Sequence, residues 1–161
     1  MPIRAYHMSA TLLAESCVLV PNGRNKVDAE IEQALEDRRP TDCLSRRDAV
    51  FSRPDLDLSK CGLSRGFLYE VELEAPQIHD QAWIGKLQAS LVKRRQKMSQ
   101  SNYLAWSPGL LDTIAGRYWS GQRFETPFLE FLTPTALVVK RLSDDLVRTV
   151  DTAGGWRPPN T

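Results

Sequence analysis

The sequence predicts a mixed α+β protein folded as one domain. The chain has 161 residues and a mass of 18.2 kDa, a size at which a single domain builds its own core. Residues 69–74 alternate apolar and acidic side chains, the period of a half-buried strand, whereas residues 27–38 place apolar side chains at helical spacing. No internal repeat or low-complexity linker interrupts the chain, so we expect one domain over residues 1–161.

Short runs of apolar and β-branched side chains mark the expected strands. The first strand follows the N-terminus at residues 3–8, and the clearest one covers residues 67–74. Further strands are expected at residues 48–52, 128–132, 137–142 and 146–150. Pro54 breaks the strand at residues 48–52, because proline cannot donate a hydrogen bond to a sheet.

Three helices are expected from apolar residues at helical spacing and from start and stop signals. The first covers residues 27–38, with acids toward its start, arginines at its end and Pro40 beyond it. The second covers residues 80–98 and the third residues 108–118, where a proline occupies the first turn. The expected inward faces are Trp83, Leu87 and Leu91 in the second helix, and Leu110, Leu111 and Ile114 in the third.

The connecting segments carry turn signals. Residues 9–13 are expected to turn away from the first strand into a brief helical piece. His79 precedes the second helix and is expected to lie near its cap. Residues 150–161, rich in glycine and proline, are expected to form an irregular tail anchored by Trp156.

Composition excludes several classes of protein. Lys and Arg number 21 against 20 Asp and Glu, so a net charge of +1 gives the whole chain no general attraction for nucleic acid or anionic membrane. The cysteines Cys17, Cys43 and Cys61 lack C-x-x-C spacing, which argues against a disulfide framework and a zinc site, and we expect no metal. No signal-peptide pattern and no run of about 20 apolar residues occurs, so a cytoplasmic protein is expected.

Glu130 is the most unusual residue of the sequence, because it interrupts the apolar residues Phe128, Leu129, Phe131 and Leu132. On a strand it shares a face with two of them. A buried carboxylate is costly and is usually paired, hydrogen-bonded or functional. The alternative is a glutamate on an edge strand that points into water.

The two histidines and the hydroxyl residues give weaker signals. His7 lies at the end of the first strand, with Ser9 two residues later, and strand ends that turn into loops are common places for ligand recognition. A partly exposed strand histidine is the alternative. The sequence has no G-x-G-x-x-G fingerprint and no P-loop, which argues against dinucleotide-fold and phosphate-loop chemistry.

The order of these parts resembles the ADP-ribosyltransferase superfamily. The matching parts are Tyr6-His7-Met8-Ser9 in the first strand, a helix, the segment from Ser45 to Ser52, the strand at residues 67–74, and a late Glu130 that begins the final strand pair. The order of histidine, aromatic residue and glutamate is similar to the branch of diphtheria toxin and the poly-ADP-ribose polymerases, in a small stand-alone bacterial or phage form. The resemblance covers most of residues 3–142 and implies split antiparallel β-sheets with flanking helices.

The resemblance implies NAD as the substrate and assigns roles to individual residues. Glu130 would hydrogen-bond a ribose hydroxyl and stabilise the positive charge that develops as nicotinamide leaves. His7 would hold the adenosine-side ribose, and Ser9 would contact the nicotinamide amide. The tyrosine of the family is replaced, so Phe51 stacks on the nicotinamide ring or Tyr69 reaches it instead, with Tyr118 as a further candidate.

Arginines in and beside the segment from Ser45 to Ser52 could contact the NAD pyrophosphate, because a guanidinium pairs with two phosphate oxygens. The candidates are Arg46, Arg47 and Arg53. The alternative is that these arginines are solvated and flank a strand.

The resemblance therefore implies a mono-ADP-ribosyltransferase that modifies a macromolecular acceptor, either a protein or a nucleic acid. The basic run at residues 93–97 allows a nucleic-acid acceptor, although such a run is usually a solvated helix face. Enzymatic alternatives are an NAD glycohydrolase and an RNA 2'-phosphotransferase-like enzyme that relies on several arginines. A catalytically inactive NAD- or ADP-ribose-binding or protein-interaction module is the alternative of another class. A toxin or phage-defence role, with an antitoxin or other protein partner, is plausible by analogy.

Overall fold

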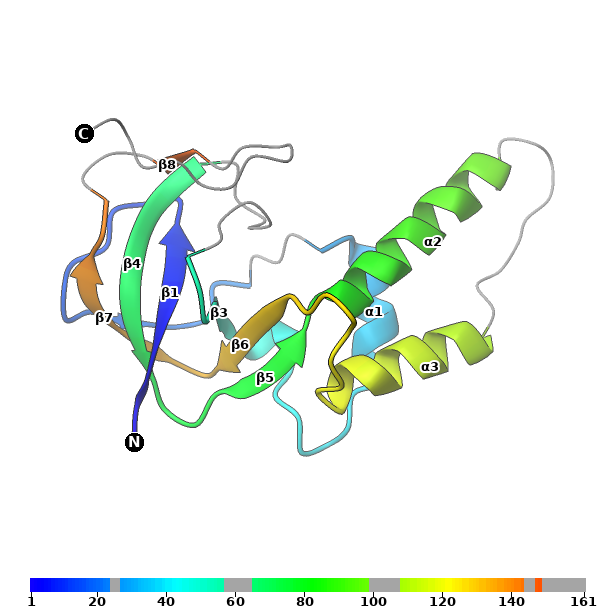
Figure 1. Cartoon of the computed structure of the whole chain (residues 1–161), viewed down its shortest axis with the longest axis horizontal. Coiled ribbons are helices and arrows are strands. Elements are labelled where there is room, and N and C mark those ends of the chain that lie inside the picture. The colour runs from blue at the N-terminus through cyan, green and yellow to red at the C-terminus, as the bar shows by residue number, and fades with distance from the viewer. Residues whose placement is uncertain (24–26, 57–64, 99–107, 144–146, 149–161) are drawn as a thin grey trace. The chain divides into compact units, whose positions relative to one another are not determined.

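The computed structural model of the chain describes residues 1–23, 27–56, 65–98, 108–143 and 147–148. Over these residues it is mixed α+β, with three α-helices and two antiparallel sheets (Figure 1). Its contacts group into two compact units. We call Met1–Lys26, Arg47–Gln77 and Phe131–Thr161 the sheet unit, and Val27–Arg46 with Ile78–Glu130 the helical unit. Each unit is described by itself below.

The larger sheet belongs to the sheet unit. Its strand order is β1-β4-β7-β2, and β8 pairs with β4 outside this path. The strands are β1 Ile3–Ser9, β2 Val18–Leu19, β4 Arg65–Leu73, β7 Ala136–Arg141 and β8 Val147–Arg148. The pairing of β1 with β4 is antiparallel and runs from Ile3 opposite Leu73 to Ser9 opposite Phe67.

Strand β4 shows why this sheet forms. Tyr69, Val71 and Leu73 are buried, whereas Glu70 and Glu72 between them are half-buried, as the alternation in the sequence predicts. On β1, Arg4 lies 2.6 Å from Glu70 and 3.8 Å from Glu72. One face of β4 therefore packs into the core while the other carries ion pairs.

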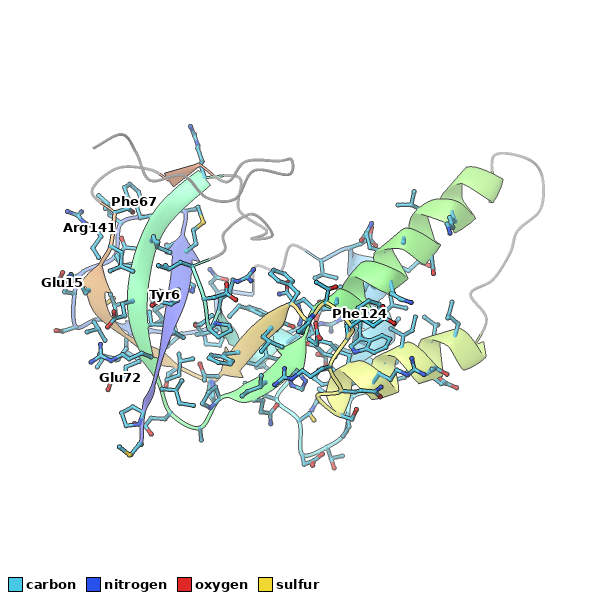
Figure 2. The ribbon with its side chains drawn as sticks, in the orientation of Figure 1. Tyr6, Glu15, Phe67, Glu72, Phe124 and Arg141 are labelled. Atoms are coloured by element: carbon cyan, nitrogen blue, oxygen red, sulfur yellow. The ribbon has the colours of Figure 1, made fainter. Side chains whose placement is uncertain are left out.

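The residues just before β2 also form hydrogen bonds with the backbone of β7. The backbone N–H of Arg141 donates to Glu15 Oε1 at 3.4 Å, and the two residues lie next to each other in Figure 2. Ser16 and Cys17 exchange backbone hydrogen bonds with Val138 at 2.8 and 2.9 Å. These bonds extend the pairing of β2 with β7.

The smaller sheet has the order β3-β6-β5, which makes β6 its inner strand. Its strands are β3 Val50–Ser52, β5 Gln77–Asp80 and β6 Leu129–Thr133. In the sheet unit, β3 pairs with β6 so that Val50 lies opposite Thr133 and Ser52 opposite Phe131. A short 3-10 helix, Arg46–Asp48, precedes β3.

The helical unit packs three helices around an apolar core. They are α1 Ala29–Glu36, α2 Ala82–Met98 and α3 Pro108–Trp119. Helix α1 starts at Asp28, whose side chain accepts the Glu30 backbone N–H at 3.0 Å, a standard N-cap. The buried core consists of Ile31 and Leu35 from α1, Trp83, Ile84, Leu87 and Leu91 from α2, and Ile114, Ala115, Tyr118 and Trp119 from α3.

The structure corrects three expectations about these elements. No brief helix follows β1, because Ser9 instead accepts the Thr11 backbone N–H at 3.2 Å in a turn. The second helix was expected to begin at residue 80 and begins at Ala82, because the Asp80 side chain accepts the Ala82 N–H at 3.0 Å. His79 lies in β5 and directly precedes this capping residue, as expected. Leu110 was expected to face inward and is exposed, whereas its neighbour Leu111 packs against the core from the same turn of α3.

The other elements agree with expectation, with shifted ends. The first helix is shorter than residues 27–38, and the strand expected at residues 146–150 is described at 147–148. Trp156 and the tail at residues 150–161 lie outside the described residues, as do the side chains of residues 94–97 in the basic run.

Gly66 on β4 gives a test of the packing of the sheet unit. A Cβ atom at this position would lie 2.7 Å from the Ser9 carbonyl oxygen and 3.1 Å from Met8 Cγ. We expect Gly66→Ala to lower the free energy of unfolding by about 1–3 kcal/mol, measured by urea denaturation. The control is Gly116→Ala in α3, where nothing lies within 4 Å, and a gain of about 0.5–1 kcal/mol is expected. Equal effects of the two substitutions would contradict the described β1–β4 packing.

Candidate functional site

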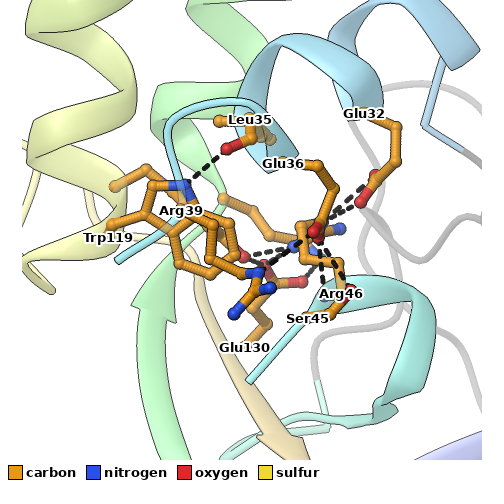
Figure 3. A network of polar contacts seen from close by, with 10 residues as sticks. Glu32, Leu35, Glu36, Arg39, Ser45, Arg46, Trp119 and Glu130 are labelled. Carbon is orange, nitrogen blue, oxygen red and sulfur yellow. Dashed lines mark hydrogen bonds and ion pairs between the residues drawn. The ribbon is translucent and has the colours of Figure 1, made fainter. Parts of the chain in front are cut away.

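Glu130 lies on β6 and is buried, with 1% of its surface exposed. Its strand is the inner one of the smaller sheet, so the alternative of an edge-strand glutamate pointing into water is wrong. The carboxylate is instead part of a polar network within the helical unit (Figure 3).

Both oxygens of Glu130 accept hydrogen bonds from side chains. Arg46 Nη1 donates to Oε1 and also to the hydroxyl of Tyr118, and this hydroxyl in turn donates to Oε1 at 2.6 Å. Gln81 Nε2 donates to Oε2. Arg46 and Tyr118 are buried, whereas Gln81 is half-buried. Gln81 is thus the one of these three partners that solvent reaches.

Arg46 also contacts a second carboxylate. Its Nε lies 3.2 Å from Glu32 of α1, and both side chains are buried. Its backbone N–H donates to Glu36 Oε1 at 3.0 Å, and Ser45 Oγ donates to the same oxygen at 3.0 Å (Figure 3). Helix α1 therefore fixes both the backbone and the side chain of Arg46.

The electrostatics of the network follow from burial and from these contacts. Burial alone would lower the pKa of Arg46, but Glu130, Tyr118 and Glu32 outweigh it and raise the pKa above its ordinary value. Burial raises the pKa of Tyr118 well above 10.0, and the charge of Glu130 raises it further. Burial also raises the pKa of Glu32, against the lowering effect of Arg46. At neutral pH the network therefore contains a permanent cation and a neutral, proton-donating tyrosine.

His79 contacts Tyr118 and so extends the network beyond Glu130 and Arg46. Its Nδ1–H donates to the Tyr118 carbonyl oxygen at 2.9 Å, and its ring stacks on the Tyr118 ring with the centroids 4.8 Å apart. Its Nε2 atom is buried and has no hydrogen-bond partner among the described residues. Burial lowers the pKa of His79, while the hydrogen bond to Tyr118 and the charge of Glu130 oppose this shift.

Asp80 positions the chain that leads to Glu130. Its fully buried carboxylate accepts backbone N–H groups from Ala82 at 3.0 Å, Phe124 at 2.7 Å and Phe128 at 2.8 Å. The backbone N–H of Gln81 also donates to the Phe128 carbonyl at 2.8 Å. One side chain thus caps α2 and fixes the loop before β6.

Six of the residues expected at the site belong to the sheet unit: His7, Ser9, Arg47, Phe51, Arg53 and Tyr69. The structure brings three of them together, because His7 Nδ1–H donates to the Phe51 carbonyl at 2.8 Å and His7 lies opposite Tyr69 in the pairing of β1 with β4. Burial lowers the pKa of His7, and this hydrogen bond opposes the shift. Ser9 Oγ lies 3.3 Å from Thr11 Oγ1 and remains in the turn after β1.

Other expected residues have structural roles in the structure. Tyr69 is fully buried and its hydroxyl accepts the Leu13 backbone N–H at 2.8 Å, so its ring is part of the core of the sheet unit. Arg46 is not a solvated arginine, whereas Arg47 beside it is exposed. Arg53 is buried and lies 3.3 Å from Asp55.

Sequence reasoning missed three members of the network: Glu32, Gln81 and His79. Glu32 had a readable signal, because it follows Ile31 on the buried side of α1, where an acid needs a partner. Gln81 and His79 had none, since their roles depend on β5, a strand of four residues without apolar alternation.

The described part of the chain shows neither a metal site nor a membrane-spanning helix. No group of three or more His, Cys, Asp or Glu side chains there is placed to hold a metal ion. No helix within the same residues is long and apolar enough to cross a membrane.

Comparison with known proteins gave no match. No protein-family model matched the chain, and neither the curated proteins nor the solved structures showed a similar one. The site is therefore interpreted from its own chemistry.

The ion pair of Arg46 and Glu130 gives a test of the network. Removing one partner leaves a buried charge unpaired, so Arg46→Gln is expected to lower the free energy of unfolding by about 3–5 kcal/mol. Arg4→Gln is the control, because the exposed pair of Arg4 and Glu70 is expected to contribute less than about 1 kcal/mol. Urea denaturation measures both. A double variant, Arg46→Met with Glu130→Leu, is expected to cost less than the two single substitutions together, and strict additivity would contradict the pairing.

His79 gives the network a pH dependence. Its pKa in the folded protein lies below the 6.5 of the unfolded chain, so the unfolded state binds more protons between the two values. The free energy of unfolding is therefore expected to fall as the pH drops below 6.5, by at most about 1.4 kcal/mol per pH unit for this histidine. His79→Asn replaces the imidazole N–H donor by an amide N–H that does not titrate, so it should flatten this slope. His7, whose pKa is also lowered, contributes separately, so His7→Asn provides the comparison. If the dependence of unfolding free energy on pH were unchanged in His79→Asn, the assignment of this dependence to His79 would be contradicted.

Proposed function

We propose that the chain is an NAD-dependent mono-ADP-ribosyltransferase that cleaves the nicotinamide–ribose bond and transfers ADP-ribose to a macromolecular acceptor. The observation that supports this most is Glu130, a buried carboxylate held by Arg46 and Tyr118 on the strand where the resemblance expects the key acid. A buried ion pair is seldom more stable than an apolar replacement, so its presence favours a functional reason.

In this proposal Glu130 stabilises the positive charge that develops on the ribose. The bond between the ribose C1' and the nicotinamide nitrogen breaks, and the bonding electrons leave with neutral nicotinamide. A nucleophilic atom of the acceptor then bonds to C1' and loses its proton. A fixed negative charge in a site that excludes water stabilises the cationic intermediate stage more than it would in bulk water.

The half-buried Gln81 is the place where substrate would reach this carboxylate. Its amide N–H donates to Glu130 Oε2, and a ribose hydroxyl is a donor of the same kind. We propose that the ribose hydroxyl replaces the amide on this oxygen, while Arg46 and Tyr118 continue to hold the other oxygen. The exchange leaves the number of hydrogen bonds to the carboxylate unchanged.

The sheet-unit residues keep their proposed roles toward NAD. His7 would bind the adenosine-side ribose, Ser9 the nicotinamide amide, and Phe51 would stack on the nicotinamide ring. Arg47 is exposed and suited to the pyrophosphate. Tyr69 is less suited to stacking, because its buried hydroxyl already accepts a backbone hydrogen bond.

A second candidate is a non-catalytic module with the same fold. It is favoured by the protein contacts on both oxygens of Glu130 and by the 1% exposure of this residue. The RNA 2'-phosphotransferase alternative gains no support from Arg46, whose guanidinium already contacts two carboxylates. The NAD glycohydrolase alternative differs from the first proposal only in using water as the acceptor.

Turnover of NAD separates the enzymatic functions from the non-catalytic module. We expect wild-type protein to release nicotinamide, measured by chromatography, and Glu130→Gln to release it about 100- to 1,000-fold more slowly, as for loss of one transition-state contact. Because Glu130→Gln also disturbs a buried pair, its near-ultraviolet circular dichroism is recorded first. Gln81→Ala is the companion variant, since it removes one donor to Glu130 and leaves the ion pair intact.

The outcomes are distinct. NAD binding by wild-type protein without nicotinamide release supports the non-catalytic module. Full turnover in folded Glu130→Gln rejects the role of this carboxylate, and wild-type protein that neither binds nor cleaves NAD rejects the proposal altogether.

A further inference from the structure

Helix α2 has an unusual charge pattern. It contains five basic residues and no acidic one: Lys86, Lys93, Arg94, Arg95 and Lys97. No Asp or Glu occurs anywhere from Gln81 to Leu111, although acids and bases are nearly equal over the whole chain. The acids that usually neutralise a solvated helix face at i, i+4 spacing are therefore missing here.

The described basic side chains of this region are exposed and have no carboxylate partner among the residues that the structure describes. Lys86 and Lys93 on α2 are seven residues apart, two helical turns, so they lie on one stripe of the helix. Arg117 of α3 and Arg123 of the following loop are exposed as well. None of these four forms an ion pair with a described residue, in contrast to Arg38, which lies 2.7 Å from Asp112.

An aromatic pair brings two of these cations to one surface. Trp83 and Phe124 meet edge to face with their centroids 4.8 Å apart. Lys86 Nζ lies over the Phe124 ring at 4.9 Å, and the Arg117 guanidinium lies over the Trp83 ring at 5.0 Å. These contacts order the side-chain stems while the charges remain at the surface.

We propose that Lys86, Lys93, Arg117 and Arg123 form a surface, here called the α2 surface, that binds the phosphodiester backbone of a nucleic acid. Exposed cations without carboxylate partners bind phosphates and release counterions as they do so. Helix α2 has 17 residues, which at about 1.5 Å per residue spans several successive phosphates. Such contacts supply affinity without reading base sequence.

An anionic membrane is a poorer partner for the α2 surface. A helix that lies on a membrane needs an apolar face free to enter the lipid. The large apolar residues Trp83, Leu87 and Leu91 of α2 are buried in the core of the helical unit instead. Of the described α2 side chains that are large and apolar, Val92 is the exposed one.

This inference does not depend on the proposed NAD chemistry, although a nucleic acid held here would be a natural acceptor for it. Binding is measured without NAD, by fluorescence anisotropy of labelled single-stranded DNA, duplex DNA and single-stranded RNA over a range of salt concentrations. The test variant is Lys86→Gln with Lys93→Gln. The control is Arg65→Gln with Lys140→Gln, two exposed bases of the sheet unit, which changes the net charge equally.

We expect the test variant to bind at least about tenfold more weakly, with a salt slope reduced by about 0.7–0.9 per lost phosphate contact. The control should bind like wild-type protein. The three probes tell single strands from duplex and DNA from RNA. Equal weakening in both variants would show only a general charge effect and would overturn the proposal. Absence of nucleic-acid binding would overturn it as well, whatever the result of the NAD experiment. Sedimentation with phosphatidylserine vesicles is the companion measurement, and binding to the vesicles alone would likewise overturn the proposal.

Discussion

The ion pair between Arg46 and Glu130 is the interaction on which the helical unit depends. Helix α1 contacts it through Glu32, α3 through Tyr118, and the segment before α2 through Gln81. Each of these elements therefore contributes a polar group to the ion pair, which lies next to the apolar core. Because a buried charge without its partner costs several kcal/mol, the elements can pack only in an arrangement that completes the pair.

The same arrangement is what makes Glu130 a candidate for chemistry. Catalytic electrostatics require groups whose positions are fixed before the substrate arrives. Arg46 and Tyr118 fix one oxygen of Glu130, and neither of them is exposed. The half-buried Gln81 is the remaining partner, so the stabilising part of the network and its reachable part are different side chains. A structural role and a catalytic role for Glu130 are therefore compatible.

Sequence patterns predicted the elements with long or strongly periodic segments. Strand β4 is visible from its alternation and α2 from the spacing of Leu87 and Leu91. Glu130 was recognisable as a residue in need of a partner, but the partner was not, because Arg46 lies 84 positions away and was expected to contact a pyrophosphate or water. Strand β5 was missed since its four residues include two polar side chains whose burial depends on tertiary contacts.

Charge shows a similar limit of sequence reasoning. The net charge of +1 suggests no preference for anionic partners, yet net charge counts buried and exposed groups alike. Among the described residues of the helical unit, the acids Glu32, Asp80 and Glu130 are buried, whereas Arg46 is the one buried side chain among the lysines and arginines. Burial therefore removes more acids than bases from the surface of this unit. The exposed surface of the helical unit is therefore more basic than its composition suggests. The network around Glu130 and the cations along α2 both result from this distribution of charge between interior and surface.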